Sequence, residues 1–212
     1  CSQCRRCSVY CPYGIDTAEI TMAAKEIMDS IGMGQKYTNE IIGKVHKIGN
    51  NLGMPGPALK NTLETMEEEV KEDTGLDVRF PVDQPGAEVL VVVPSADFFA
   101  EPHVYSLMGY AKVFHAAGIR WTLSSHASEA GNFGLFIGNY EQMRKIASRV
   151  REAAQELGVK RIVVGECGHA WRVAYSFWNT LIGPFDWLDS RYPVPQHICE
   201  LTWDLIQRGA IT

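Results

Sequence analysis

The sequence predicts an α+β chain of several domains, and three observations support this prediction. Four of the six cysteines lie within residues 1–11. Apolar residues then recur at helical spacing over residues 18–86. From residue 87 to 212, short apolar runs alternate with helical patterns, as in a parallel sheet. We therefore expect a metal-binding segment at 1–17, a helical linker region at 18–86, and an α/β domain at 87–212 with a parallel sheet of about four strands.

The N-terminal segment has the spacing C-x2-C-x2-C-x3-C-P, and its cysteines are Cys1, Cys4, Cys7 and Cys11. In iron–sulfur proteins with two clusters, three thiolates of such a run bind one [4Fe-4S] cubane and the fourth ligates the other cluster. A zinc site usually takes two cysteine pairs separated by a longer loop. The segment therefore predicts the C-terminal half of a 2[4Fe-4S] ferredoxin-like module.

A second cluster would need cysteines that this chain does not supply. Only Cys167 and Cys199 remain, and the chain begins on the first cysteine of the motif. We therefore expect an internal fragment from which the other half of the ferredoxin-like module is missing. The alternative is a single cluster that is held by all four N-terminal cysteines.

The composition is that of a soluble globular protein, with 46% hydrophobic and 21% charged residues. The net charge of −5 does not favour a nucleic-acid partner. Because most of the cysteines belong to one metal motif, the expected compartment is reducing, and we predict a cytoplasmic location. The longest apolar run, at 89–93, is too short to span a bilayer, so membrane contact would need a partner.

Three helices are predicted in the linker region from apolar residues spaced three or four apart. The first begins at the acidic cap Asp16 and ends at Gly32, the second runs from Thr38 to Gly53, and the third ends near Gly75. Their predicted buried faces are, in order, Ile20, Ala24, Ile27, Met28 and Ile31, then Ile41, Val45, Ile48 and Leu52, then Leu59, Leu63, Met66 and Val70. An acidic run at 67–69 is expected to face solvent.

The α/β part is predicted to contain four strands, at 89–93, 119–123, 161–164 and 194–198. The continuous apolar run of the first strand is typical of a strand that is buried on both faces. The predicted helices run from Pro102 to Gly118, from Asn139 to Gly158, from Ala170 to Ile182, and from the last strand to Gly209. The glycine-containing segment 132–138 lacks the spacing of a nucleotide-binding loop, and we interpret it as a lid or a partner contact.

Ligands of open parallel sheets bind beyond the carboxyl ends of the strands. Ser95, the run Ser124-Ser125-His126, and Cys167 follow the first three predicted strands, so we expect them along one edge.

Cys167 lies between glycines, with Glu166 before it and His169 after it. Its thiol would then be accessible for reaction or metal binding, and its neighbours could carry protons. The alternative is that Cys167 is a small buried apolar residue and that His169 begins a helix. We interpret His126 as a cap or a loop hydrogen bonder, Cys199 as structural, and the aromatic residues within 171–187 as core or interface.

The order of these parts resembles that of heterodisulfide reductase D-type proteins, whose α/β domains carry the CCG pattern of one cysteine, an adjacent pair and C-x-x-C. The segment 166–170, with 124–126 ahead of it, is most similar to the DsrK subunit of the sulfite-reduction-associated membrane complex. The resemblance covers essentially the whole chain. Ser95, Ser124, Ser125 and Ala170 stand where cysteines would be expected, and only Cys167 remains. The domain therefore resembles a degenerate copy.

The resemblance implies an oxidoreductase of sulfur metabolism that passes electrons from a quinol-linked donor through [4Fe-4S] cubane clusters to a disulfide- or trisulfide-type substrate. The four N-terminal cysteines would bind the cubanes. Cys167 would be a ligand or a thiol at a non-cubane [4Fe-4S] cluster completed by missing downstream residues, and His169 or Glu166 would carry protons. The implied partners are membrane-bound quinol-oxidising subunits and a small sulfur-carrier protein or thiol substrate, with the chain peripheral to the membrane.

Two alternative functions remain open at this point. The chain could be the iron–sulfur relay subunit of a quinone-linked hydroxy-acid or glycerol-3-phosphate dehydrogenase, which would not break a sulfur bond. It could also be a non-catalytic assembly module whose degenerate domain docks partners. The retention of Cys167 at a strand end argues against the second alternative.

Overall fold

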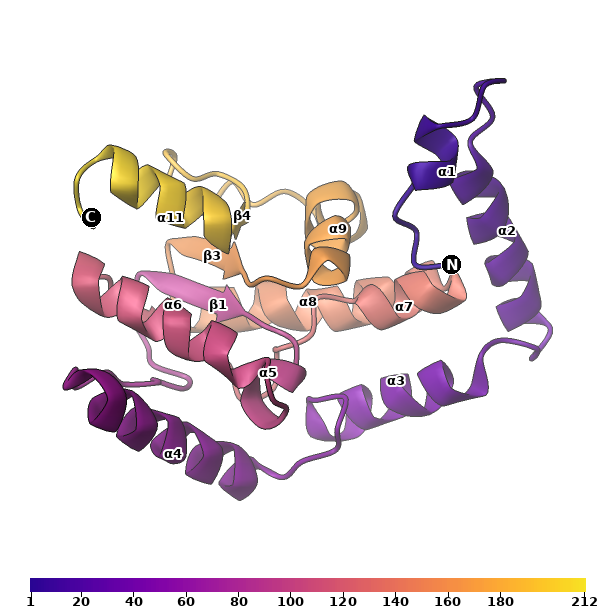
Figure 1. Cartoon of the computed structure of the whole chain (residues 1–212). Helices are drawn as coiled ribbons and strands as arrows, with labels where there is room; N and C mark the ends of the chain where they lie inside the picture. The colour runs from indigo at the N-terminus through magenta and orange to yellow at the C-terminus, as the bar shows by residue number, and fades with distance from the viewer.

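The sheet of this protein has four strands in the order β2-β1-β3-β4, and all pairings are parallel. The computed structural model describes all residues 1–212 (Figure 1). The strands are β1 (Val89–Val92), β2 (Trp121–Thr122), β3 (Arg161–Val164) and β4 (Gln196–His197). The predicted parallel sheet is therefore confirmed, with shorter second and fourth strands than expected. Because all strands run the same way, their carboxyl ends share one edge.

The remaining elements are eleven helices. Their bounds are α1 Arg6–Val9, α2 Thr17–Ser30, α3 Lys36–Ile48, α4 Gly56–Thr74, α5 Ala96–Phe99, α6 Val104–Ala117, α7 Asn132–Ile137, α8 Tyr140–Glu156, α9 Gly168–Ser176, α10 Trp178–Ile182 and α11 Ile198–Gln207. None of them combines the length and the apolar character needed to cross a lipid bilayer.

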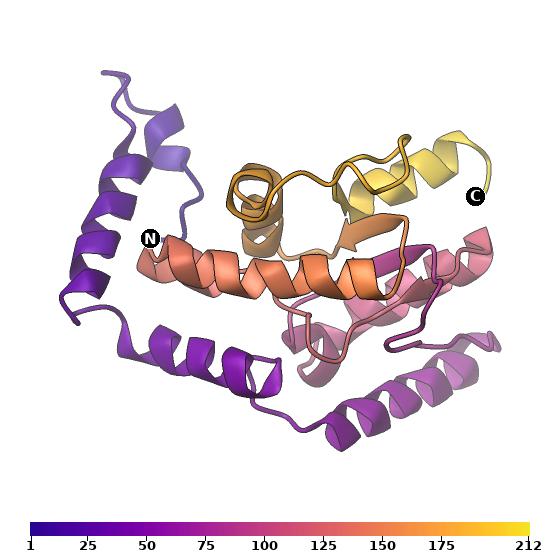
Figure 2. The ribbon, with the colours of Figure 1, turned by 180° about the vertical axis from the view of Figure 1, so that it is seen from behind.

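Helices cover both faces of the sheet. All residues of β1 and β3 are buried. For β1 the continuous apolar run predicts this, whereas β3 begins with the buried cation Arg161. Leu90 and Val92 face a core that includes residues of α8, α9 and α10. Val89 and Val91 face the opposite core, which includes residues of α4, α6 and α11. Figures 1 and 2 show these two layers from opposite sides, with α6 and α11 on one side of the strands and α8 on the other.

The linker helices α3 and α4 pack onto the α/β part. Ile41 and Val45 of α3 are buried in a cluster that also contains Phe133 and Ile146. In α4 the predicted face Leu63, Met66 and Val70 is buried in the sheet core. Helix α3 ends at Gly49, where the backbone is left-handed (φ 95°), so Leu52 lies outside the helix. The boundaries 1–17, 18–86 and 87–212 stay a prediction.

The predicted buried face of α2 is wrong. Ile20, Ile27 and Ile31 are 61%, 62% and 61% exposed, whereas Ala18 and Met22 are buried. Helix α2 packs against α1 and α7 and lies at the periphery of the molecule in both views (Figures 1 and 2). Helical spacing reveals an apolar stripe but not the side of the helix that a neighbour covers.

The segment 132–138 is a buried helix, so its interpretation as a lid is wrong. Helix α7 packs against α3, α8 and α9. Its glycines allow this close packing, because a Cβ at Gly134 would lie 2.6 Å from the backbone nitrogen of Met143 in α8. Asn139 caps α8 as predicted, and its Oδ1 accepts a hydrogen bond from the Gln142 N–H.

Three other predictions need correction. Glu67 is not fully solvated, because its carboxylate pairs with Arg79 and accepts a hydrogen bond from the Phe80 N–H. The helix predicted at 170–182 is two helices, α9 and α10, which are separated at Phe177. Cys199 is exposed in the first turn of α11, so its thiol does not belong to the core.

Candidate functional site

The four N-terminal cysteines lie in a loop at the surface. All four are unpaired thiols; the first three are exposed and the fourth is half-buried. Gln3 and Arg5 have left-handed backbone (φ 60° and 58°) and lie in the two gaps between the first three cysteines. These two positions shape the turns between the cysteines, but the sulfur atoms of the loop do not converge as a ligand group in this structure.

Polar contacts fasten the cysteine loop to α2. Arg5 forms ion pairs with Asp16 and Glu19. Ser8 Oγ donates to Asp16 Oδ1 at 2.5 Å, and the same oxygen accepts the Glu19 N–H at the start of α2. Lys25 donates to the carbonyl of Cys1. The loop is therefore held at several points between residues 1 and 8.

The chemistry of the loop fits an iron–sulfur cluster. Four thiolates form a soft donor set, which selects Fe–S clusters or zinc over hard cations. The hydroxyl of Thr17 is buried without an oxygen or nitrogen partner, and its approach lowers the pKa of the Cys7 thiol. A lowered pKa favours the thiolate, which is the form that binds metal.

The positions after β1, β2 and β3 share the carboxyl edge of the sheet, as expected from their strand ends. Ser124 is buried and its Oγ lies 3.4 Å from Nδ1 of His126, which is exposed in the loop. The Ser125 N–H donates to Asp83. These residues make local hydrogen bonds, consistent with the interpretation of His126 as a loop hydrogen bonder.

Ser95 is completely buried and bonded to an acid that sequence reasoning missed. Its N–H and Oγ both donate to Oε1 of Glu129, at 3.1 and 2.5 Å, and its Oγ accepts the N–H of Asn51. Glu129 is 2% exposed, and its Oε2 has no hydrogen-bond partner. Burial raises the pKa of Glu129. Its position in the loop after β2 carries no recognisable motif, so only the fold brings it to Ser95.

Cys167 is half-buried at the N-terminus of α9. Its side chain packs against the core under α8 and α9. Burial raises the pKa of the Cys167 thiol, although the backbone N–H groups of Ala170 and His169 partly oppose this shift. The His169 ring packs edge-on against Phe136, with centroids 5.0 Å apart. Cys167 is thus both partly accessible and partly a packing residue.

Glu166 lies with two residues that were not predicted, Asp97 and His103. Potential ligand atoms of the three side chains lie within 4.8 Å of one another. Asp97 is completely buried in α5. Burial, together with the charges of Glu166 and Glu129, raises the pKa of Asp97 to about 8. One indication of this group is present in the sequence, namely that Asp97 lies two residues after Ser95, which is predicted to follow the end of the first strand.

The cysteine loop and the start of α9 line the same cavity. This cavity has a volume of about 500 Å³, and its walls include Cys4, Arg5, Gly168 and His169. Gly168 directly follows Cys167. The fold therefore brings the metal motif next to the strand end that carries the candidate thiol, although more than 150 residues separate them in the sequence.

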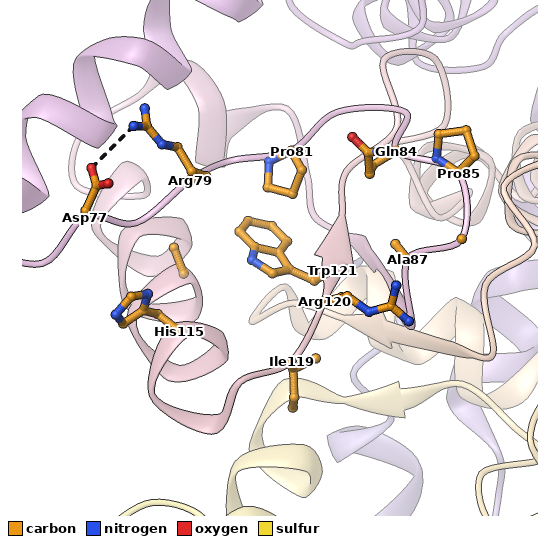
Figure 3. A pocket seen from close by; sticks show the side chains of 12 residues that line it. Asp77, Arg79, Pro81, Gln84, Pro85, Ala87, His115, Ile119, Arg120 and Trp121 are labelled. Carbon is orange, nitrogen blue, oxygen red and sulfur yellow. Dashed lines mark hydrogen bonds and ion pairs between the residues drawn. The ribbon is translucent and has the colours of Figure 1, made fainter.

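A different cavity, of about 460 Å³, lies at the amino ends of β1 and β2 (Figure 3). Figure 3 shows Arg79 paired with Asp77 at its rim, and Trp121 and Arg120 at its wall. This is the opposite edge of the sheet from Ser95 and Cys167, and open parallel sheets do not usually bind ligands there.

The chain combines a cysteine motif of iron–sulfur spacing with a parallel α/β domain. The chain is 42% identical over 188 residues to the Hdr-like menaquinol oxidoreductase iron-sulfur subunit of Archaeoglobus profundus. The matched region is 87% of this chain and 34% of the relative. It is also 40% identical over 185 residues to the Hdr-like menaquinol oxidoreductase iron-sulfur subunit 2 of Archaeoglobus fulgidus. This matched region is 85% of the chain and 33% of the relative.

The chain spans about a third of the length of the curated relatives it matches. These similarities support an Hdr-like iron–sulfur subunit. No protein-family model and no solved structure matches the chain.

Proposed function

We propose that this chain is the iron–sulfur part of a heterodisulfide-reductase-like oxidoreductase. It passes electrons from a quinol-linked donor to a disulfide- or trisulfide-type substrate, in the manner of the DsrK-type subunits that it resembles. The observation that carries the proposal is the cavity lined by Cys4, Gly168 and His169, because the metal motif there faces the start of α9, directly after Cys167 in the sequence. The names of the curated relatives support the quinol-linked donor.

The N-terminal loop is the electron-entry side of this proposal. When bound, [4Fe-4S] clusters supply one-electron transfer there. Cys1, Cys4 and Cys7 hold one cubane, and Cys11 reaches the other. Lys25, which donates to the carbonyl of Cys1, would offset part of the negative charge of a thiolate-bound cluster, whereas Arg5 is already paired with Asp16 and Glu19.

The start of α9 is the substrate side. Cleaving a disulfide to two thiols consumes two electrons, which the quinol-linked donor supplies, and two protons. Cys167 is the thiol or cluster ligand beside the broken bond. His169 lines the cavity, and Glu166 is exposed directly before Cys167. In this proposal these two residues deliver the protons.

The proposal places the chain in a larger assembly. Its partners are membrane-bound quinol-oxidising subunits and a small sulfur-carrier protein or thiol substrate. The chain is then cytoplasmic and peripheral to the membrane.

The test uses the intact protein with its partner subunits and compares Cys167→Ala with Cys199→Ala. Cys199 is an exposed cysteine in α11 and serves as the matched control. Menaquinol-dependent reduction of a disulfide or trisulfide should fall at least about a hundredfold in Cys167→Ala, as for loss of a group that acts in the reaction. Spectra of the cubane clusters should be unchanged in both variants.

Two outcomes would contradict the proposal. Equal turnover per folded molecule in Cys167→Ala and Cys199→Ala would show that Cys167 contributes to packing and not to the reaction. Reduction of the clusters by a hydroxy acid or glycerol 3-phosphate, without any disulfide turnover, would favour the relay alternative.

A further inference from the structure

The group Asp97, His103 and Glu166 draws its members from three separate segments. Asp97 is in α5 after β1, His103 directly precedes α6, and Glu166 follows β3. Their potential ligand atoms lie within 4.8 Å of one another, and Nδ1 of His103 is 3.8 Å from a carboxylate oxygen of Glu166. The three side chains therefore converge on one point at the carboxyl edge of the sheet.

Asp97 is the unusual member of this group. It is 0% exposed, and neither of its carboxylate oxygens has a hydrogen-bond partner. Leaving a buried carboxyl group without a hydrogen-bond partner is costly whether the group is charged or neutral. None of the ion pairs in the structure involves Asp97, and the other acids near it, Glu129 and Glu166, add negative charge. A bound cation would satisfy both oxygens and offset this charge.

The ligand chemistry narrows the class of cation. Two carboxylates and one imidazole suit a first-row transition metal, whereas Mg²⁺ and Ca²⁺ prefer sites made of oxygen alone. Zn²⁺ binds this combination of oxygen and nitrogen ligands. His103 and Glu166 are 50% and 41% exposed along their side chains, so the outer coordination positions would be open to water or a small ligand.

We propose that Asp97, His103 and Glu166 form a binding site for a divalent transition-metal ion, with Zn²⁺ as the best fit. Asp97 is the inner ligand, and His103 and Glu166 are the outer ligands. The site contains no cysteine, and so its chemistry differs from that of the N-terminal loop. It does not depend on the proposed redox function. While a metal ion is bound, Glu166 is held as a ligand, and His169 alone is left to deliver protons.

Co²⁺ is the probe, because its spectrum reports the ligand type. Thiolate ligands give an intense charge-transfer band in the near ultraviolet, which carboxylate and imidazole ligands do not give. The chain is titrated with Co²⁺ in the Cys4→Ser background, in which the thiolate loop is broken. One Co²⁺ per chain should bind with weak visible bands, and the same ion should raise the midpoint of thermal unfolding.

Asp97→Asn and Glu166→Gln should each weaken Co²⁺ binding at least about tenfold, since even changes around a ligand cost about 10–100-fold. Glu101→Gln is the matched control, because it changes an exposed acid two residues from His103 that is outside the group. Glu166 is exposed, so its variant is expected to fold even if Asp97→Asn does not.

Three results would overturn the site. The first is the absence of Co²⁺ binding in the Cys4→Ser background. The second is bound Co²⁺ that shows only the thiolate band. The third is equal affinity of Glu166→Gln and Glu101→Gln. Failure of the cluster experiments on the N-terminal loop would leave this result unaffected, so the two proposals can fail separately.

Discussion

Ser95 donates two hydrogen bonds to one oxygen of Glu129, from its backbone N–H and from its Oγ. Both residues are buried, at 0% and 2% exposure. The CCG pattern would have a cysteine at position 95. In this chain the position holds Ser95, whose hydroxyl is bonded to Glu129.

The buried carboxyl of Glu129 should make stability depend on pH. Its pKa in the folded chain is raised above the usual 4.5, so the folded state binds more protons than the unfolded state between these two values. Stability should therefore fall as the pH rises from about 4.5 through the folded pKa, and level off above it.

Glu129→Gln removes this titration while its amide oxygen can still accept from Ser95. Urea unfolding at a series of pH values, with a chelator present, should show a smaller decline of stability with rising pH in Glu129→Gln than in the parent chain. Identical pH profiles would mean that Glu129 is solvated enough to keep its ordinary pKa.

The exposed face of α2 should contribute little to stability in this chain. Met22 is 4% exposed and Ile27 is 62% exposed on the same helix. Met22→Ala should lower the free energy of unfolding by about 2 kcal/mol, and Ile27→Ala should change it by no more than about 0.5 kcal/mol. Urea denaturation of the two variants measures the difference. Equal losses would show that the apolar stripe predicted from the sequence is covered in solution.

Gly134 should tolerate no side chain, because α7 and α8 touch there. A Cβ at Gly134 would lie 2.6 Å from Met143, whereas a Cβ at Gly109 in α6 would meet nothing within 4 Å. Gly134→Ala should therefore cost about 1–3 kcal/mol of stability through overpacking. Gly109→Ala should be neutral or stabilise the helix by up to about 1 kcal/mol. Thermal unfolding compares the two, and a stable Gly134→Ala would contradict the close approach.

Cys4 and Cys11 should serve different clusters in the intact protein. The C-x2-C-x2-C-x3-C-P spacing assigns the first three cysteines to one cubane and the fourth to another. Anaerobic reconstitution with iron and sulfide, followed by electron paramagnetic resonance of the reduced protein, should lose one signal in Cys4→Ser and a different one in Cys11→Ser. Identical spectra from the two variants would instead support one cluster held by all four cysteines.

The sequence by itself determined the elements whose pattern is local. The C-x2-C-x2-C run defines a thiolate loop through spacing alone. The apolar run of β1 specifies a buried strand because strands covered on both faces are mostly apolar, although β3 also holds the buried Arg161. Helices connect the successive strands, and so the strands run parallel to one another. Ser95 and Cys167, which follow two of these strands, therefore lie at the same edge of the sheet.

Only the tertiary structure decided which groups meet. Helical spacing could not say which side of α2 would find a neighbour, because burial depends on what packs against the helix. Asp97, His103 and Glu166 lie in separate segments with no shared motif, so their approach required the crossovers between β1 and β3. Cys4 and Gly168 line one cavity because residues 1–16 fold back on the α/β part. No local sequence pattern encodes this long-range arrangement.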